Sequence, residues 1–135
     1  MTDTPKTPPQ NTQTPYALLG GEAVLRQLVA RFYEIMNTLP EVRVIRKMHA
    51  ADLDGAADKL FKFLSGWLGG PDLFIQEYGH PRLRSRHFPF HIGVAERDQW
   101  MLCMDKALDE MPMDAKLREL IRQAMARTAT NMINQ

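Results

Sequence analysis

Apolar side chains recur three and four residues apart along most of this 135-residue chain, and no segment shows the strict alternation of a half-buried strand. This period places the apolar residues of each segment on one face of a helix. The pattern predicts helices at about 24–36, 42–48, 53–67, 94–110 and 114–132. We therefore expect an all-α fold in which two helix pairs enclose one core.

Single residues predict where these helices end and which face they bury. Asp52 is a suitable N-cap for the helix that follows it, and Gly69-Gly70-Pro71 should end that helix. Residues 71–92 contain three prolines and no long period, so we expect a loop with one helical turn before Pro89. The inward face of the last helix is predicted to hold Leu117, Leu120, Ile121, Ala124 and Thr128.

Length and composition predict one domain with a short tail. Residues 1–15 are polar and rich in proline, and they cannot bury enough apolar surface to offset the entropy of ordering them. We expect a disordered tail over 1–15 and a folded domain over 16–135.

Charge and cysteine usage exclude several classes of protein. Lys and Arg total 17 against 16 for Asp and Glu, so the basic excess typical of a nucleic-acid or membrane-surface binder is missing. Cys103 is the single cysteine and cannot form an intrachain disulfide. No apolar run approaches the ~18 residues of a membrane helix, and no signal pattern opens the chain. We expect a cytoplasmic protein.

The segment 80–100, H-P-R-L-R-S-R-H-F-P-F-H-I-G-V-A-E-R-D-Q-W, mixes surface and core residue types. Its first twelve residues hold three of the 4 histidines, three arginines and the apolar step Phe88-Pro89-Phe90. Such a mixture is typical of a pocket rim, with imidazole facing inward and guanidinium facing outward. His87 lies one helical turn after Leu83 and should point into an apolar space. An apolar pocket with an imidazole inside and cations at its mouth suits a haem.

Plainer interpretations of the same residues stay open at this point. No histidine pair has the spacing of a zinc protease, and any one histidine can be a surface or capping group. The arginines can form a solvated basic face, and without exposed aromatic residues their nucleic-acid signal is weak. Tyr33 and Trp100 can be core residues, although each would bring a hydrogen-bond donor into an apolar space. Ser65 and Cys103 have no partners for nucleophilic catalysis.

Several motifs together resemble the truncated haemoglobins, the short globins with a two-over-two helical sandwich around a haem, and in particular their second group. They are Gly20-Gly21, Phe32-Tyr33, F-L-S-G-W-L-G-G-P (63–71), G-H-P-R-L-R-S-R-H-F-P-F (79–90) and E-R-D-Q-W-M-L-C-M (96–104). The resemblance covers residues 16–132. It implies a non-covalent b-type haem, and no C-x-x-C-H motif for covalent attachment is present.

The resemblance also assigns roles to residues. The pattern R-H-x-P-F makes His87 the iron ligand, whereas His80 and His91 fall outside it. Tyr33, His49 and Trp100 match the distal polar positions, and Ala56 replaces the usual distal histidine. Leu60, Phe63 and Leu64 would form the distal wall, and Lys59, Arg84 and Arg86 would meet the propionates. Phe74 stands where many relatives have tyrosine, so it can only pack. The other expected haem contacts are Ile45, Leu53, Leu83, Phe90, Ile92 and Met104.

These inferences predict a protein that binds O₂ and other diatomic ligands at its haem, in oxygen, NO or peroxide chemistry. One alternative is a haem enzyme, a peroxidase or NO dioxygenase, which would need an external reductase because no flavin or nicotinamide domain is encoded. Another is a helical interaction module without a cofactor. We expect no nucleic-acid or membrane partner, and a monomer or homodimer.

Overall fold

A computed structural model describes residues 14–135, and the expected disordered tail falls outside this range except for Thr14 and Pro15. The described residues form helices and no strand, which confirms the all-α fold. The elements are α2 (Pro15–Leu19), α3 (Gly21–Thr38), η1 (Pro40–Val42), α4 (Arg43–Lys47), α5 (Asp54–Trp67), α6 (Leu73–Tyr78), α7 (Leu83–His87), α8 (Val94–Asp109) and α9 (Ala115–Thr130).

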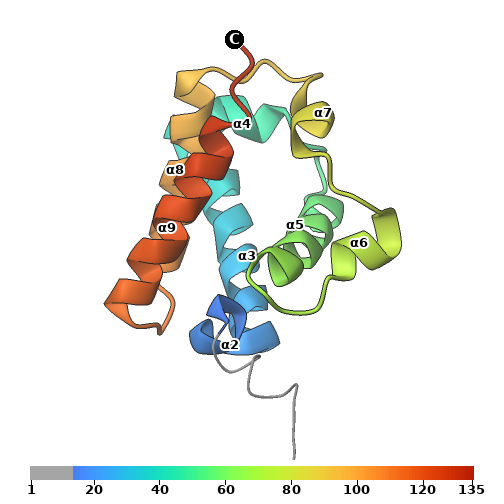
Figure 1. Cartoon of the computed structure of the whole chain (residues 1–135). Coiled ribbons are helices and arrows are strands. Elements are labelled where there is room, and N and C mark those ends of the chain that lie inside the picture. Colours follow the sequence, from blue (N-terminus) through green and yellow to red (C-terminus); the bar gives the residue numbers. More distant parts are fainter. Residues whose placement is uncertain (1–13) are drawn as a thin grey trace, which may run out of the picture.

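Helix α3 is the centre of the fold. It packs against α5 on one side and against α8 on the other, and α8 packs against α9. Figure 1 shows α8 and α9 side by side, with α5, α6 and α7 across from them. The apolar stripe of α3 supplies fully buried side chains to the core, among them Leu25, Leu28 and Phe32. Two helix pairs therefore share one core, which is the two-over-two arrangement.

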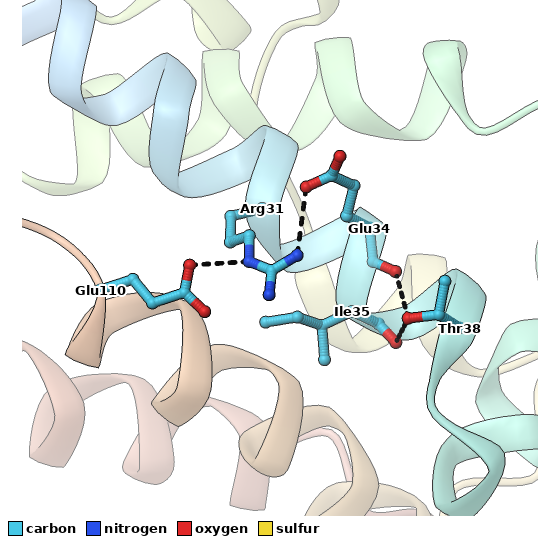
Figure 2. A network of polar contacts seen from close by, with 5 residues as sticks. All are labelled: Arg31, Glu34, Ile35, Thr38 and Glu110. Carbon is cyan, nitrogen blue, oxygen red and sulfur yellow. Dashed lines mark hydrogen bonds and ion pairs between the residues drawn. The ribbon is translucent and has the colours of Figure 1, made fainter.

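A polar network ties α3 to the end of α8 on the outer surface (Figure 2). The Arg31 guanidinium donates to Glu110 Oε1 at 2.7 Å and to Glu34 Oε1 at 3.2 Å. The Thr38 hydroxyl donates to the Glu34 carbonyl at 3.0 Å, one turn back on α3. These side chains are exposed, so water and salt screen them, and the network contributes little to stability beside the apolar core.

The structure corrects two expectations about helix ends and faces. Asp52 is not the N-cap of α5, because α5 begins one residue later and Leu53 takes that position. Asp52 instead accepts a hydrogen bond from the Asp54 amide at 2.8 Å. Leu120 is 66% exposed, whereas the buried residues of α9 are Leu117, Ile121 and Met125. The stripe of α9 is turned toward α8, so its edge residue Leu120 falls outside the contact.

The start of the domain and the 71–92 segment also differ from expectation. Thr14 and Pro15, assigned to the tail, form the N-cap and first turn of α2, where the Thr14 hydroxyl accepts from the Ala17 amide at 3.1 Å. The 71–92 segment holds the two short helices α6 and α7 instead of one turn. Phe88, a residue type that is usually buried, is 68% exposed. Helices this short are not visible in sequence periodicity.

The turn after α5 comes close to α2 at Gly70. The Tyr16 amide donates to the Leu68 carbonyl at 2.9 Å, which brings the Tyr16 ring over the turn. A Cβ atom built at Gly70 would lie 2.5 Å from the Tyr16 ring, whereas one at Gly55 in α5 would meet nothing within 4 Å. Only glycine fits at position 70 without moving α2.

We therefore expect Gly70→Ala and Gly55→Ala to change stability in opposite directions. Gly70→Ala should lower the free energy of unfolding by about 1–3 kcal/mol, as overpacking does. Gly55→Ala should raise it by about 0.5 kcal/mol by restricting the unfolded chain. Urea unfolding of the two variants measures both changes. Equal effects of the two substitutions would contradict the close packing of Tyr16 on Gly70.

Candidate functional site

A cavity of about 350 Å³ lies between the two helix pairs, within the size range of cofactor pockets. Its wall is mostly apolar and draws on every helix from α3 to α9. Most of the expected site residues line it: Tyr33, Ile45, His49, Ala56, Lys59, Leu60, Phe63, Leu64, Phe74, Leu83, Arg86, His87, Phe90, Ile92 and Trp100. Residues from both ends of the chain thus meet around one space.

His87 is the last residue of α7 and is half-buried at the cavity wall. Its Nδ1 lies 2.8 Å from the carbonyl oxygen of Leu83, one turn earlier. With Nδ1 donating to this carbonyl, Nε2 is left as the acceptor nitrogen, and the ring orientation is restrained. This is the arrangement that a histidine ligand to a metal needs.

Two residues that carry hydrogen-bond donors, Tyr33 and Trp100, line the cavity from the core side. Phe32 is fully buried and contacts both Tyr33 and Trp100, with ring centroids 4.8 Å and 5.1 Å away. The nearest acceptor to the Tyr33 hydroxyl is the Ala56 carbonyl at 3.5 Å, which is long for a hydrogen bond. Burial raises the pKa of Tyr33 well above its usual range, so its hydroxyl keeps its proton.

His49 lies on the same side of the cavity as Tyr33. The two ring centroids are 5.8 Å apart, and His49 Nδ1 lies 2.8 Å from the Ile45 carbonyl. Arg46 holds the backbone around it, donating to the carbonyls of Ala50 and Ala51 at 3.0 and 2.9 Å and to Asn37 Oδ1 at 2.9 Å. The position of His49 therefore depends on a fixed connection between α4 and α5.

Cationic side chains stand among the lining residues at the exposed side of α5 and α7. Lys59 and Arg86 are both exposed. Arg86 donates to the Pro81 carbonyl at 2.6 Å, and its guanidinium lies 5.2 Å from the centre of the Phe74 ring. Phe74 itself is buried and meets the Phe63 ring edge-on. Phe74 therefore packs, and it also carries the Arg86 guanidinium over its face.

Three expected site residues do not line the cavity. Met104 is fully buried in the core, one turn beyond Trp100 on α8. Leu53 packs against the core at the start of α5. Arg84 is exposed and donates to the Asn131 carbonyl. Met104 thus shares the face of Trp100 on α8 but lies one turn farther along, in the core, and Leu53 stands before the first turn of α5.

Other lining residues were not expected from the sequence. They are Met48, Trp67, Glu96, Arg97, Met125, Thr128, Ala129 and Met132. Trp67 continues the predicted stripe of α5 by one turn beyond Phe63, so spacing could have found it. Thr128 was predicted to face inward, but spacing does not show which α9 residues face the cavity, because that depends on how α9 crosses α8. Arg97 donates to Thr130 at 2.8 Å and thereby joins α8 to α9 beside the cavity.

The remaining reactive groups offer no second site. Within residues 14–135 no cluster of three metal-ligating side chains occurs. Cys103 is fully buried in the core, and burial raises the pKa of its thiol to about 11, so it stays protonated. None of the helices in this part of the chain combines the length and apolar character needed to cross a membrane.

Comparison with known proteins shows the family to which the chain belongs. The model of the bacterial-like globin family matches residues 14–134. The group 2 truncated hemoglobin of Bacillus subtilis is 38% identical over 126 residues, covering 93% of this chain and 92% of that protein.

Two solved structures are also similar. The cold-adapted truncated hemoglobin of the Antarctic bacterium Pseudoalteromonas haloplanktis is 49% identical with a TM-score of 0.89, covering 91% of this chain and 99% of that one. A truncated haemoglobin of Bacillus subtilis, described as oxygen-avid, is 38% identical with a TM-score of 0.83, covering 90% and 100%. The chain therefore belongs to the bacterial-like globins and, within them, to the group II truncated haemoglobins, a family of haem-based ligand-binding proteins.

Proposed function

We propose that this protein binds O₂ and related diatomic ligands at a b-type haem held in the cavity, with His87 as the iron ligand. The observation that carries the proposal is the half-buried His87 imidazole on an apolar cavity wall, with Nδ1 engaged by Leu83 and Nε2 left as the acceptor. Ferrous haem iron binds O₂, CO and NO reversibly. Membership in the globin family argues against a helical module without a cofactor.

The residues present fit a haem at three places. His87 supplies the nitrogen ligand, and the apolar side chains of Leu60, Phe63 and Leu64 keep water from the space facing it. Lys59 and Arg86 supply positive charge at the exposed side, where the two propionates of a b-type haem would need cations. The chain thus offers one complementary group for each polar part of the cofactor.

Tyr33, Trp100 and His49 favour retention of polar ligands. The Tyr33 hydroxyl has only a long contact to a carbonyl, so donating to a ligand would disrupt little. Ala56 has no donor to offer, which leaves the donation to the aromatic residues and His49. The similar protein described as oxygen-avid is consistent with slow O₂ release. Turnover of NO or peroxide would require electrons from a reductase, which we propose as an external partner.

His87→Ala should abolish haem retention or weaken it severely, because it removes the nitrogen ligand. His80→Ala and His91→Ala are matched controls, since both histidines are exposed and absent from the cavity wall. Absorption spectra of the purified variants, oxidised and reduced, measure haem content and coordination. Loss of haem in His91→Ala but not in His87→Ala would contradict the assignment.

Arg86→Ala should speed haem transfer to an acceptor such as apomyoglobin by up to about fivefold, the scale of an exposed ion pair. Arg127→Ala removes a charge from an exposed position on α9 outside the cavity wall and should leave the transfer rate unchanged. Equal rates in the two variants would remove Arg86 from the proposed haem contacts. Tight DNA binding that weakens with salt would support a nucleic-acid role for the arginines instead.

Tyr33→Phe and Trp100→Phe should each raise the O₂ dissociation rate by about tenfold, since a hydrogen bond of this kind contributes ~1–3 kcal/mol and 1.4 kcal/mol is a factor of ten. The double variant should fall short of the product of the two, because both donors would serve one acceptor. CO release should change less, since CO is a weaker acceptor. Stopped-flow ligand displacement measures the O₂ and CO dissociation rates of the wild type and of each variant. Unchanged O₂ release in both single variants would make these residues ordinary core aromatics.

A further inference from the structure

The segment after α9 returns to the loop that follows His87. Figure 1 shows this segment running beside the connection between α7 and α8. The Asn134 amide donates to the Ile92 carbonyl at 2.8 Å, so the two backbones meet directly. Residues far apart in the sequence are thus joined on the side of the cavity where His87 stands.

The Asn134 side chain makes three further contacts with the same loop. Its Oδ1 accepts from the Ile92 amide at 3.0 Å. Its Nδ2 donates to the Phe90 carbonyl at 2.9 Å and, at a longer 3.4 Å, to the His87 carbonyl. One amide therefore bridges both ends of the loop from His87 to Ile92.

These contacts require a side chain that both donates and accepts. An amide does this, whereas a carboxylate of the same shape would present an oxygen to the carbonyl oxygens of His87 and Phe90. Alanine would leave the Ile92 amide and the carbonyls of His87 and Phe90 without these side-chain partners. The amide of Asn134 matches both the donors and the acceptors of the loop.

The loop has little apolar packing to hold it. Helix α7 contains no buried residue, and Phe88 and Phe90 are both exposed. Ile92 is buried and lines the cavity, but it lies at the far end of the loop. Hydrogen bonds, more than apolar packing, therefore determine where the His87 backbone stands relative to α8 and α9.

We propose that Asn134 is a positioning residue for His87: it fixes the loop between His87 and Ile92 and so sets the place of the imidazole in the cavity wall. The inference rests on the proposed function insofar as His87 is the iron ligand. Asn134 itself does not touch the cavity, and it acts through the loop backbone.

Hydrogen exchange tests the restraint itself, without relying on ligand binding. In the purified full chain, with and without added haem, Asn134→Ala should reduce protection of the Ile92 amide by at least about tenfold, because its acceptor is removed. Gln123→Ala, which removes an exposed amide from α9, should leave Ile92 unchanged. Unchanged protection of Ile92 in Asn134→Ala would overturn the proposal.

Haem-loaded protein tests the effect on His87. Asn134→Ala and the isosteric Asn134→Asp should both release haem to apomyoglobin about tenfold faster than wild type, and both should broaden the iron–histidine stretching band of the ferrous protein. A residue that only adds general stability would leave that band unchanged. Wild-type behaviour of Asn134→Asp in both measurements would overturn the hydrogen-bonding argument, since it would show that shape alone suffices.

The two proposals fail in different ways. If the wild-type protein retains no haem, the proposed function fails, while the exchange of Ile92 still decides whether Asn134 restrains the loop. If haem is retained through His87 but neither Asn134 variant changes exchange, haem release or the stretching band, only the positioning role of Asn134 is wrong.

Discussion

Hydrogen bonds position the His87 imidazole, which stands on a helix without buried residues. Helix α7 has 5 residues, none of them buried, yet it carries the His87 imidazole. The ring is fixed by the Leu83 carbonyl within the helix, and the following backbone is fixed by Asn134 from beyond α9. A directional bond at each end can place a side chain that packing alone would leave mobile.

The opposite wall is built in another way. Tyr33 stands beside Phe32, whose ring is fully buried and also contacts Trp100. Apolar packing between α3 and α8 therefore sets the positions of the Tyr33 and Trp100 side chains. The molecule thus combines a densely packed side, which restrains the Tyr33 and Trp100 side chains, with a looser side tied by polar contacts. For this reason we expect substitutions at Tyr33 and Trp100 to change ligand release, and substitutions that loosen the loop after His87 to change haem retention.

Much of the site was predictable from sequence because its residues occur in distinctive local patterns. His87 and Arg86 stand in R-H-F-P-F, and Ala56, Leu60, Phe63 and Leu64 follow one another on a single helical face of α5. Residues from α9 could not be predicted, because an apolar stripe on that helix serves both the α8 contact and the cavity. Met125 and Ala129 reach the cavity while Leu120 faces outward, and only the crossing of α9 over α8 decides this.

The sequence by itself determined the helical periods, the breaks at glycine and proline, and the chemistry of the residues placed near His87, since these depend on contacts within a few residues. Tertiary structure alone decided which neighbours enter the cavity: Met48 and Arg97 do, whereas Leu53, Arg84 and Met104 do not. It also brought Asn134 to the loop after His87, more than forty residues away in the chain. The physical reason is that the apolar stripe of a helix is wider than the area that one neighbouring helix covers. The relative placement of the helices therefore decides which side chains of the stripe pack against a neighbour and which face the cavity.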